Sequence, residues 1–205
     1  MLLTRPEGRN ERLAERLRAL GYDVVVTPLV AVEPIESGPV DLDGYDWLVL
    51  TSATGARELR RRAVGAARRV AAIGRATAEA WGEVDLVPRL STQEDLLAEL
   101  PRPAGRVLFA GAEGARPLLA RELGADVVSL YRTRPLRPTG PVGGDLAVVA
   151  SASAARALAA ITRAIPVVSI GPETSAAATD AGLVVAAEAA SQTVEGLVSA
   201  VRAAG

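Results

Sequence analysis

The chain lacks three residue types on which much enzyme chemistry depends. Among its 205 residues there is no histidine and no cysteine, and all 23 basic residues are arginine, so lysine is absent too. Imidazole acid–base catalysis, thiolate nucleophiles, Schiff bases and a phosphate-loop lysine are therefore excluded. A zinc site would have only carboxylate ligands, and we predict no metal. Any catalysis must use hydroxyls, carboxylates, arginine, backbone amides and positioning.

Long apolar runs and a surplus of charge are also missing. No apolar run approaches the roughly 18 to 20 residues that cross a bilayer, and we expect no membrane partner. The segment Met1–Pro6 has charge and proline where a signal peptide would be apolar, so we expect a cytoplasmic protein. A net charge of −1 argues against a nucleic-acid partner. The composition, 49% hydrophobic and 23% charged, is typical of a globular chain.

Short apolar runs alternate with longer amphipathic stretches along the whole chain. This alternation predicts the α/β class, with largely parallel sheets and helices between the strands. The expected strands are Leu2–Thr4, Val24–Thr27, Trp47–Thr51, Arg69–Ile73, Val107–Ala110, Val127–Leu130, Ala147–Ala150 and Val167–Ile170. The clearest helix follows the first strand, with Leu13, Leu17 and Leu20 in one stripe and Gly21 at its end.

The two halves of the chain resemble each other at a separation of about 100 residues, which indicates an internal repeat. The matched pairs are Trp47–Ala53 with Leu146–Ala152, Ile73–Ala78 with Ile170–Ser175, and Thr92–Leu96 with Thr193–Leu197. The opening unit Leu3–Val25 recurs more loosely as Leu108–Val128. We therefore expect two similar α/β domains.

Two stretches rich in proline and glycine, at about 28–44 and 131–144, are the predicted linkers. Because they bracket the middle of the chain, we expect a domain of residues 38–130 inserted into a discontinuous domain of residues 1–34 and 136–205. The chain would then cross between the domains twice. We expect a ligand cleft between the two domains, because such clefts are common binding sites.

Each half carries two strand-to-helix turns built from glycine and small hydroxylic residues. Such turns expose unpaired backbone N–H groups at the positive end of a helix dipole, so they can bind carboxylates or phosphates without lysine. The candidate substrate-binding residues in these turns are Ser52, Thr77, Ser151, Ser153, Gly171 and Thr174. For each turn taken singly, the alternatives are an ordinary N-cap or an ordinary turn glycine.

Two longer side chains complete the candidate site. Arg5 follows the first strand and is a candidate carboxylate clamp, the alternative being a solvated surface arginine. Tyr131 begins the second linker, where its phenol can donate a proton or simply wedge the domain junction. No turn forms the six-residue glycine fingerprint of dinucleotide binding, so we predict no nicotinamide or flavin cofactor.

Taken together, these motifs resemble the uroporphyrinogen-III synthase family over essentially the whole chain, and their order and spacing carry the likeness. The matching pieces are Leu3–Pro6, Gly21, Pro28–Leu29, Pro34, Tyr45–Trp47, Thr51–Ala53, Ile73–Ala78, Tyr131–Pro135, Ile170–Thr174 and Thr193–Leu197. Two departures are Ser175, where the family usually has alanine, and Ala150, where it often has threonine or phenylalanine.

The resemblance implies two α/β domains joined by a two-stranded linker, and a monomeric, cofactor-free lyase of heme and tetrapyrrole biosynthesis. The implied substrate is hydroxymethylbilane, a linear tetrapyrrole with eight carboxylates, which is cyclised to uroporphyrinogen III with inversion of ring D and loss of water. It also implies that Tyr131 is the family tyrosine proposed as the acid for the leaving hydroxyl, and that Thr77 and Thr174 are the threonines of the cleft. The preceding enzyme of the pathway would be a transient partner.

The alternative from another class is a non-enzymatic two-domain binding protein that senses an anionic metabolite. A periplasmic receptor of this type would need an export signal, and the segment Met1–Pro6 does not read as one. The specific order of the family motifs counts against a cytoplasmic sensor.

Overall fold

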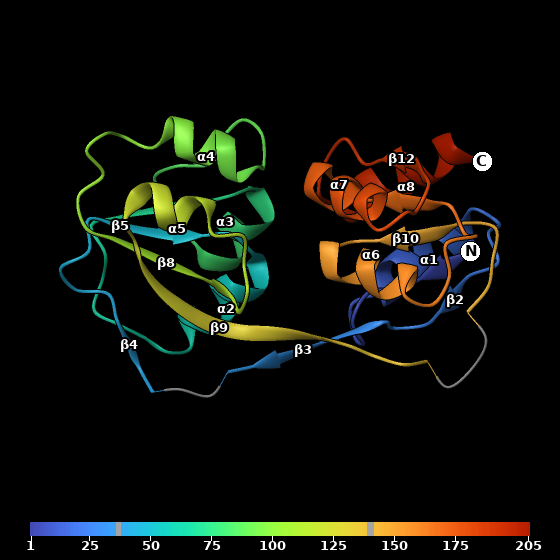
Figure 1. Ribbon diagram of the computed structural model, residues 1–205, viewed down its shortest axis with the longest axis horizontal. Coiled ribbons are helices and arrows are strands. Elements are labelled where there is room, and N and C mark those ends of the chain that lie inside the picture. Colours follow the sequence, from blue (N-terminus) through green and yellow to red (C-terminus); the bar gives the residue numbers. More distant parts are fainter. Residues whose placement is uncertain (36–37, 139–141) are drawn as a thin grey trace. The chain divides into compact units, whose positions relative to one another are not determined.

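The computed structural model describes residues 1–35, 38–138 and 142–205 (Figure 1). Residues 36–37 and 139–141, which belong to the predicted linkers, lie outside the described residues. The chain forms two compact units, unit 1 of Met1–Val32 with Thr133–Gly205 and unit 2 of Glu33–Arg132. Both are built from largely parallel sheets with helices, which confirms the expected α/β class. Among the described helices, none has the length and apolarity needed to span a membrane.

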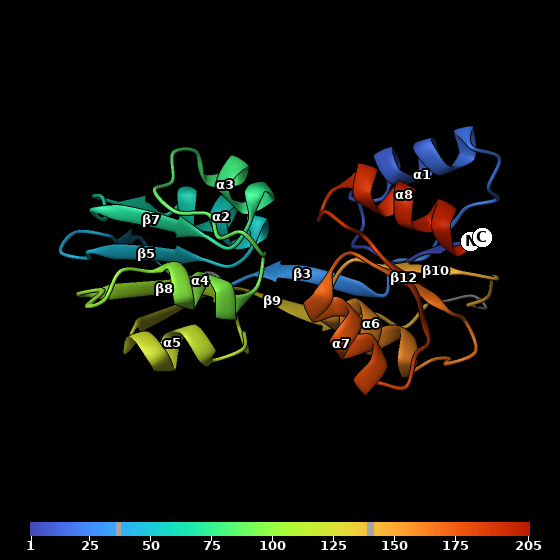
Figure 2. The ribbon, with the colours of Figure 1, turned by 90° about the horizontal axis from the view of Figure 1, so that it is seen from above.

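Unit 1 contains a five-stranded parallel sheet in the order β12-β11-β10-β1-β2. Its strands are β1 (Leu2–Leu3), β2 (Val25–Val26), β10 (Ala147–Val149), β11 (Val167–Ser169) and β12 (Val185–Glu188). Its helices are α1 (Glu11–Ala19), α6 (Ala152–Ala159), α7 (Pro172–Asp180) and α8 (Val194–Ala204). Leu2 packs with α6 and α7, whereas Leu3 packs with α1 and α8, so helices cover both faces. Figure 2 shows α1 beside α8.

Unit 2 forms most of a second five-stranded sheet in the order β3-β9-β8-β5-β7, of which β3 and β9 also include residues of unit 1. Its strands are β3 (Val30–Pro34), β5 (Trp47–Leu50), β7 (Arg69–Ala72), β8 (Val107–Ala112) and β9 (Asp126–Pro135), with β4 (Val40–Asp41) and β6 (Ala63–Val64) in a separate pair. Its helices are α2 (Ala53–Arg60), α3 (Arg75–Trp81), α4 (Gln93–Glu99) and α5 (Leu118–Leu123). Trp47, Val49 and Phe109 pack with residues of α4 and α5 in a buried cluster.

Equivalent strands are neighbours in the sheets of both units, but they occur in a different order along the chain. Strands β10 and β11 correspond to β5 and β7, and β12 corresponds to the parallel bridge that Leu86 makes with Ala71. Strands β1 and β2 correspond to β8 and β9, which unit 2 visits last although unit 1 visits them first. In such doubly wound sheets ligands bind at the carboxyl ends of the strands where the order reverses. That point lies between β1 and β10 in unit 1 and between β8 and β5 in unit 2.

Each predicted strand overlaps an observed one, but the sequence did not reveal the strands in the predicted linkers. Strand β3 lies within 28–44 and the end of β9 lies within 131–144, and the two strands are neighbours in the sheet, as the family resemblance implied. The N–H of Ile35 donates to the carbonyl of Leu130 (2.9 Å). Pro34 is tolerated here because β3 is an edge strand. The proline content of this segment therefore led to the prediction of a linker where strand β3 forms.

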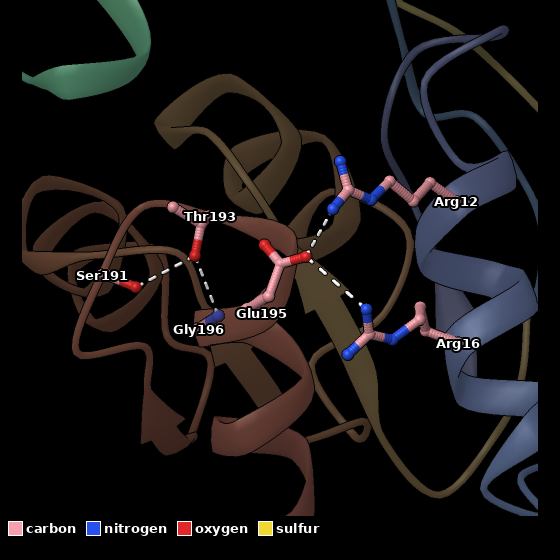
Figure 3. Close-up of polar contacts among 6 residues, drawn as sticks. All are labelled: Arg12, Arg16, Ser191, Thr193, Glu195 and Gly196. Carbon is pink, nitrogen blue, oxygen red and sulfur yellow. Dashed lines mark hydrogen bonds and ion pairs between the residues drawn. The ribbon is translucent and has the colours of Figure 1, made fainter.

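Equivalent glutamates at helix starts form ion pairs with arginines in the two units. In unit 1, Glu195 at the start of α8 contacts Arg12 (2.6 Å) and Arg16 (3.6 Å) of α1 (Figure 3). In unit 2, Glu94 at the start of α4 contacts Arg116 (2.7 Å), which precedes α5. The pKa of Glu195 lies below its ordinary value, chiefly because its carboxylate accepts a backbone hydrogen bond and also because of Arg12 and Arg16. These exposed pairs contribute little stability each.

Candidate functional site

The carboxyl edge of the sheet in unit 1 is where three candidate turns meet. Arg5 follows β1, Ser151 is the N-cap of α6 after β10, and Gly171 is the N-cap of α7 after β11. Because β1, β10 and β11 are adjacent parallel strands, their following turns lie along one edge. The structure therefore brings together the candidates that the sequence assigned to this half of the chain.

Arg5 is held at this edge by its backbone and its neighbours. The hydroxyl of Thr4 donates to the carbonyl of Val148 (2.8 Å), and the amide of Asn10 donates to the carbonyl of Arg5 (2.9 Å). Both Thr4 and Asn10 are buried, so the loop between β1 and α1 is anchored from inside. Arg5 itself is only partly exposed, unlike the solvated surface arginine considered as the alternative.

The guanidinium of Arg5 has no hydrogen-bonded or ion-paired partner among the described residues. Burial lowers its pKa from the ordinary value, and the nearby charge of Arg9 lowers it further while Glu11 opposes the change. Within residues 1–35, 38–138 and 142–205, no side chain forms a hydrogen bond or an ion pair with this guanidinium. A partly buried charge without compensation is unfavourable, so an anion bound here would relieve that cost.

The start of α6 confirms an N-cap and adds a second hydroxyl. Ser151 Oγ accepts from the N–H of Ala154 (3.2 Å), so the capping alternative is correct for Ser151. Its hydroxyl also hydrogen-bonds to that of Ser153 (3.0 Å), which lies within the first turn of the helix. The other N–H groups of this first helical turn have no partner inside the helix, and they remain able to bind an anion.

The start of α7 has no side-chain cap, because glycine occupies the N-cap position and proline follows it. Thr174 lies in the first turn and is 5% exposed, so the capping alternative is wrong for this threonine. A Cβ atom on Gly171 would lie 3.1 Å from Nε2 of Gln192, so that side chain lies beside the turn. Gln192 belongs to none of the predicted site motifs, although it directly precedes the repeated Thr193.

Ser175, which departs from the family pattern, belongs to a chain of hydroxyls behind this turn. Its Oγ lies 2.5 Å from that of Ser169 on β11, and it donates to the carboxylate of Glu188 on β12. These contacts link α7 to two strands of the sheet. They hold the helix start in place, so Ser175 has a structural role that alanine at this position could not have.

Unit 2 repeats this arrangement with different side chains. Ser52 caps α2 by accepting from the N–H of Gly55 (2.9 Å), and Gly74 is the N-cap of α3. Thr77 lies in the first turn of α3 and is 4% exposed, so it too is not a cap. Ser91 takes the place of Gln192, because a Cβ atom on Gly74 would lie 2.6 Å from its Oγ.

Tyr131 lies on β9, and its phenol reaches the start of α2. The hydroxyl donates to Ser52 Oγ (2.9 Å), although 79 positions separate the two residues in the chain. The tyrosine is 8% exposed, and it lies opposite Ala112 of β8. The structure thus joins two candidate residues that the sequence analysis treated separately.

Other features of the described residues do not form a competing site. A hollow of about 470 Å³ beside Arg68, Arg69 and Asp85 lies at the amino end of β7, away from the edge at which parallel sheets bind ligands. Among the described residues no group of three or more histidine, cysteine or carboxylate side chains could hold a metal ion.

Comparisons with known proteins agree on one family. The family described as uroporphyrinogen-III synthase HemD matches residues 11–199. A putative uroporphyrinogen-III synthase of Methanocaldococcus jannaschii is 26% identical over 147 residues, covering 65% of this chain and 61% of that protein. The uroporphyrinogen-III synthase of Synechococcus elongatus is 29% identical over 159 residues, covering 65% and 60%. The match thus spans about three fifths of the length of these relatives.

Two solved structures share the fold. A mutant uroporphyrinogen III synthase from Thermus thermophilus superposes with a TM-score of 0.68 at 17% identity, covering 99% of this chain and 97% of that chain. The uroporphyrinogen-III synthetase of Helicobacter pylori superposes with a TM-score of 0.60 at 15% identity, covering 87% and 91%. With the family match extending over residues 11–199, the chain belongs to the uroporphyrinogen-III synthase family.

Proposed function

We propose that this chain is a lyase that cyclises hydroxymethylbilane to uroporphyrinogen III, with inversion of ring D and loss of water. Family membership supports the reaction, and the name of the Synechococcus elongatus relative, uroporphyrinogen-III synthase, supports the product. The observation that carries the proposal is the guanidinium of Arg5 among amide-rich turns, to which no side chain of the described residues is hydrogen-bonded or ion-paired. A substrate with eight carboxylates supplies the anions that this edge lacks.

Binding is proposed to use backbone amides and a single arginine rather than lysines. Small residues at the turns let a carboxylate approach the N–H groups, and hydroxyls add hydrogen bonds to it. The residues proposed to bind the substrate are Arg5, Ser151, Ser153, Gly171 and Thr174 in unit 1, with Ser52 and Thr77 in unit 2. Each sheet edge offers donors of this kind by itself.

The proposed chemistry needs one acid and close control of conformation. Tyr131 gives its phenolic proton to the terminal hydroxyl of the bilane, the carbon–oxygen bond breaks and water leaves. The electron-rich pyrrole then attacks to form the spiro intermediate, and rejoining the ring reverses ring D. Because the bilane closes unaided to the uninverted isomer, orienting the substrate is the main task of the protein.

The proposed setting is a cytoplasmic monomer with domains at 1–34 plus 136–205 and at 38–130. A chain without cysteine suits a reducing compartment, although it does not require one. Light scattering of the purified protein is expected to give the mass of one chain, and twice that mass would contradict the monomer.

The function is tested by giving the purified protein freshly made hydroxymethylbilane. We expect mainly the type III isomer after oxidation and chromatography, formed faster than in a protein-free control. A type I product at the control rate would overturn the proposal. If the protein bound the bilane tightly without changing rate or isomer, the binding-protein alternative would replace the enzyme.

A further inference from the structure

The position of Tyr131 depends on an irregularity in the sheet of unit 2. Gly111 pairs with Ser129, but Ala112 pairs with Tyr131, so Leu130 is an extra residue on β9. The carbonyl of Leu130 still has a partner, because it accepts from the N–H of Ile35 (2.9 Å). An extra residue exchanges the faces of all residues that follow it relative to the partner strand. This bulge therefore sets which face of the sheet Tyr131 occupies.

Two glycines let α2 approach that face closely. A Cβ atom on Gly55 would lie 3.1 Å from Ser52 Oγ and 3.6 Å from the Cα of Gly111. The distance to Gly111 is an ordinary van der Waals contact, whereas the distance to Ser52 Oγ is tight, so a side chain at position 55 would crowd the hydroxyl of Ser52. The close approach brings the capping serine of α2 within hydrogen-bond distance of Tyr131, at 2.9 Å.

Ser52 Oγ accepts two hydrogen bonds in this arrangement. One comes from the N–H of Gly55 (2.9 Å) and the other from the phenol of Tyr131 (2.9 Å). A hydroxyl has two lone pairs and one hydrogen, so these bonds use both lone pairs and leave its own hydrogen to donate. Ser52 can therefore accept a hydrogen bond from the phenol of Tyr131 before the reaction and donate one to its oxygen afterwards.

We infer that Ser52, although it is one of the proposed substrate-binding residues, is instead a positioning residue that acts through Tyr131. The inference rests on the proposed function. Before the reaction Ser52 orients the phenol. For the reaction the phenol turns its single hydrogen from Ser52 to the leaving hydroxyl. Ser52 then donates its own hydrogen to the phenolic oxygen, which becomes the phenolate, while it still accepts from Gly55.

The proton balance of this cycle is complete within the reaction. The hydroxyl leaves as water with the phenolic proton, and ring closure later releases one proton from the attacked pyrrole. That proton returns to the phenolate, so no other acid or base is required. A hydrogen bond to an ionised oxygen is roughly twice as strong as a neutral one, so Ser52 stabilises the charged stage more than the resting stage.

The test is a double-mutant cycle in the full chain, with Ser52→Ala, Tyr131→Phe and both together. We expect Ser52→Ala to lower kcat about three- to tenfold, the range for one hydrogen bond, with KM within about twofold. Tyr131→Phe slows turnover without abolishing it. In the Tyr131→Phe background, Ser52→Ala is expected to change kcat by less than about twofold, because its effect passes through the phenol.

Further variants separate this role from capping of α2. Ser52→Thr keeps a hydroxyl and is expected to retain kcat within about twofold. Ser52→Asp keeps the cap but has no proton to give, so kcat should fall at least as far as in Ser52→Ala. Thr92→Ala removes the equivalent cap of α4, where Thr92 accepts from the N–H of Asp95 (3.2 Å), and should leave kcat unchanged.

The outcomes distinguish the alternatives. A rise in KM with unchanged kcat in Ser52→Ala would make Ser52 a substrate contact and overturn the inference. Additive losses in the double variant, or wild-type kcat in Ser52→Asp, would overturn it as well. If the unsubstituted protein itself gave only the type I isomer, the proposed function would fail together with this inference.

Discussion

The environment of Arg5 shows how the surroundings of one residue can indicate the charge of a ligand. Its guanidinium is partly buried, burial lowers its pKa, and no side chain in the described part of the chain pairs with it. Stability alone does not explain a cation in such a place, because an apolar side chain would avoid the desolvation cost. Ligand binding does explain it, because a carboxylate of the substrate would supply the missing partner.

Replacing Arg5 therefore separates binding from stability. In Arg5→Met we expect KM to rise about tenfold or more, which corresponds to a loss of about 1.4 kcal/mol of binding free energy. The free energy of unfolding in urea should be unchanged or higher, because an uncompensated charge is removed. Arg202→Met is the control, since Arg202 is exposed in the last turn of α8. Equal KM values for the two variants would remove Arg5 from the site.

At the scale of elements, the start of α8 shows what a repeat in sequence does not specify. Thr193 and Thr92 cap equivalent helices in the same way, by accepting from an N–H three residues later. That third residue is Gly196 in unit 1 but Asp95 in unit 2, where the Asp95 carboxylate accepts from the N–H of Leu90 (2.7 Å). The same cap is thus supported by two different loops.

The loop of unit 1 requires glycine at position 196. A Cβ atom there would collide with the carbonyl oxygen of Ser191, in the turn shown in Figure 3. We expect Gly196→Ala to lower the free energy of unfolding by about 1–3 kcal/mol through overpacking, although alanine favours helix by about 0.5–1 kcal/mol. Ser199→Ala, on the exposed face of α8, should stay within about 0.5 kcal/mol. Urea denaturation of both variants measures the free energy of unfolding. An unchanged value for Gly196→Ala would mean that the turn at Ser191 moves to accommodate the Cβ atom.

The whole molecule is organised by the insertion of one unit into the other. Unit 1 takes its central strands from both ends of the chain, because β1 lies between β10 and β2 in the sheet. Unit 2 is continuous, and it holds its own buried cluster around Trp47, Phe109 and Leu119. The two units therefore depend differently on an intact chain.

Expressing parts of the chain tests this difference. Residues 33–132 alone are expected to unfold cooperatively in urea, because they contain their own core. Residues 133–205 alone should show no cooperative transition, because they lack β1, the strand that pairs with β10 in the sheet. Joining residues 1–32 to 133–205 through a flexible linker should restore a transition. A cooperative transition in 133–205 alone would show that β1 is dispensable.

Local patterns in the sequence determined the α/β class, the repeat, the excluded chemistries and the glycine and hydroxyl turns. These features depend on neighbours in the chain, such as the apolar run Trp47–Leu50 followed by the capping Ser52. Strand β3 escaped prediction because Pro34, together with Pro28 before the strand, also fits a linker. Thr77 and Thr174 looked like caps because only backbone geometry places the N-cap three residues earlier, at Gly74 and Gly171.

The tertiary structure alone decided what depends on residues far apart in the chain. The bond from Tyr131 to Ser52 requires the bulge in β9 and the close approach of α2 to β8. The different order in which the two units visit equivalent strands follows from how the sheets assemble. Hydrophobic periodicity constrains each element by itself, whereas pairing and packing between distant elements set the geometry in which the proposed chemistry would occur.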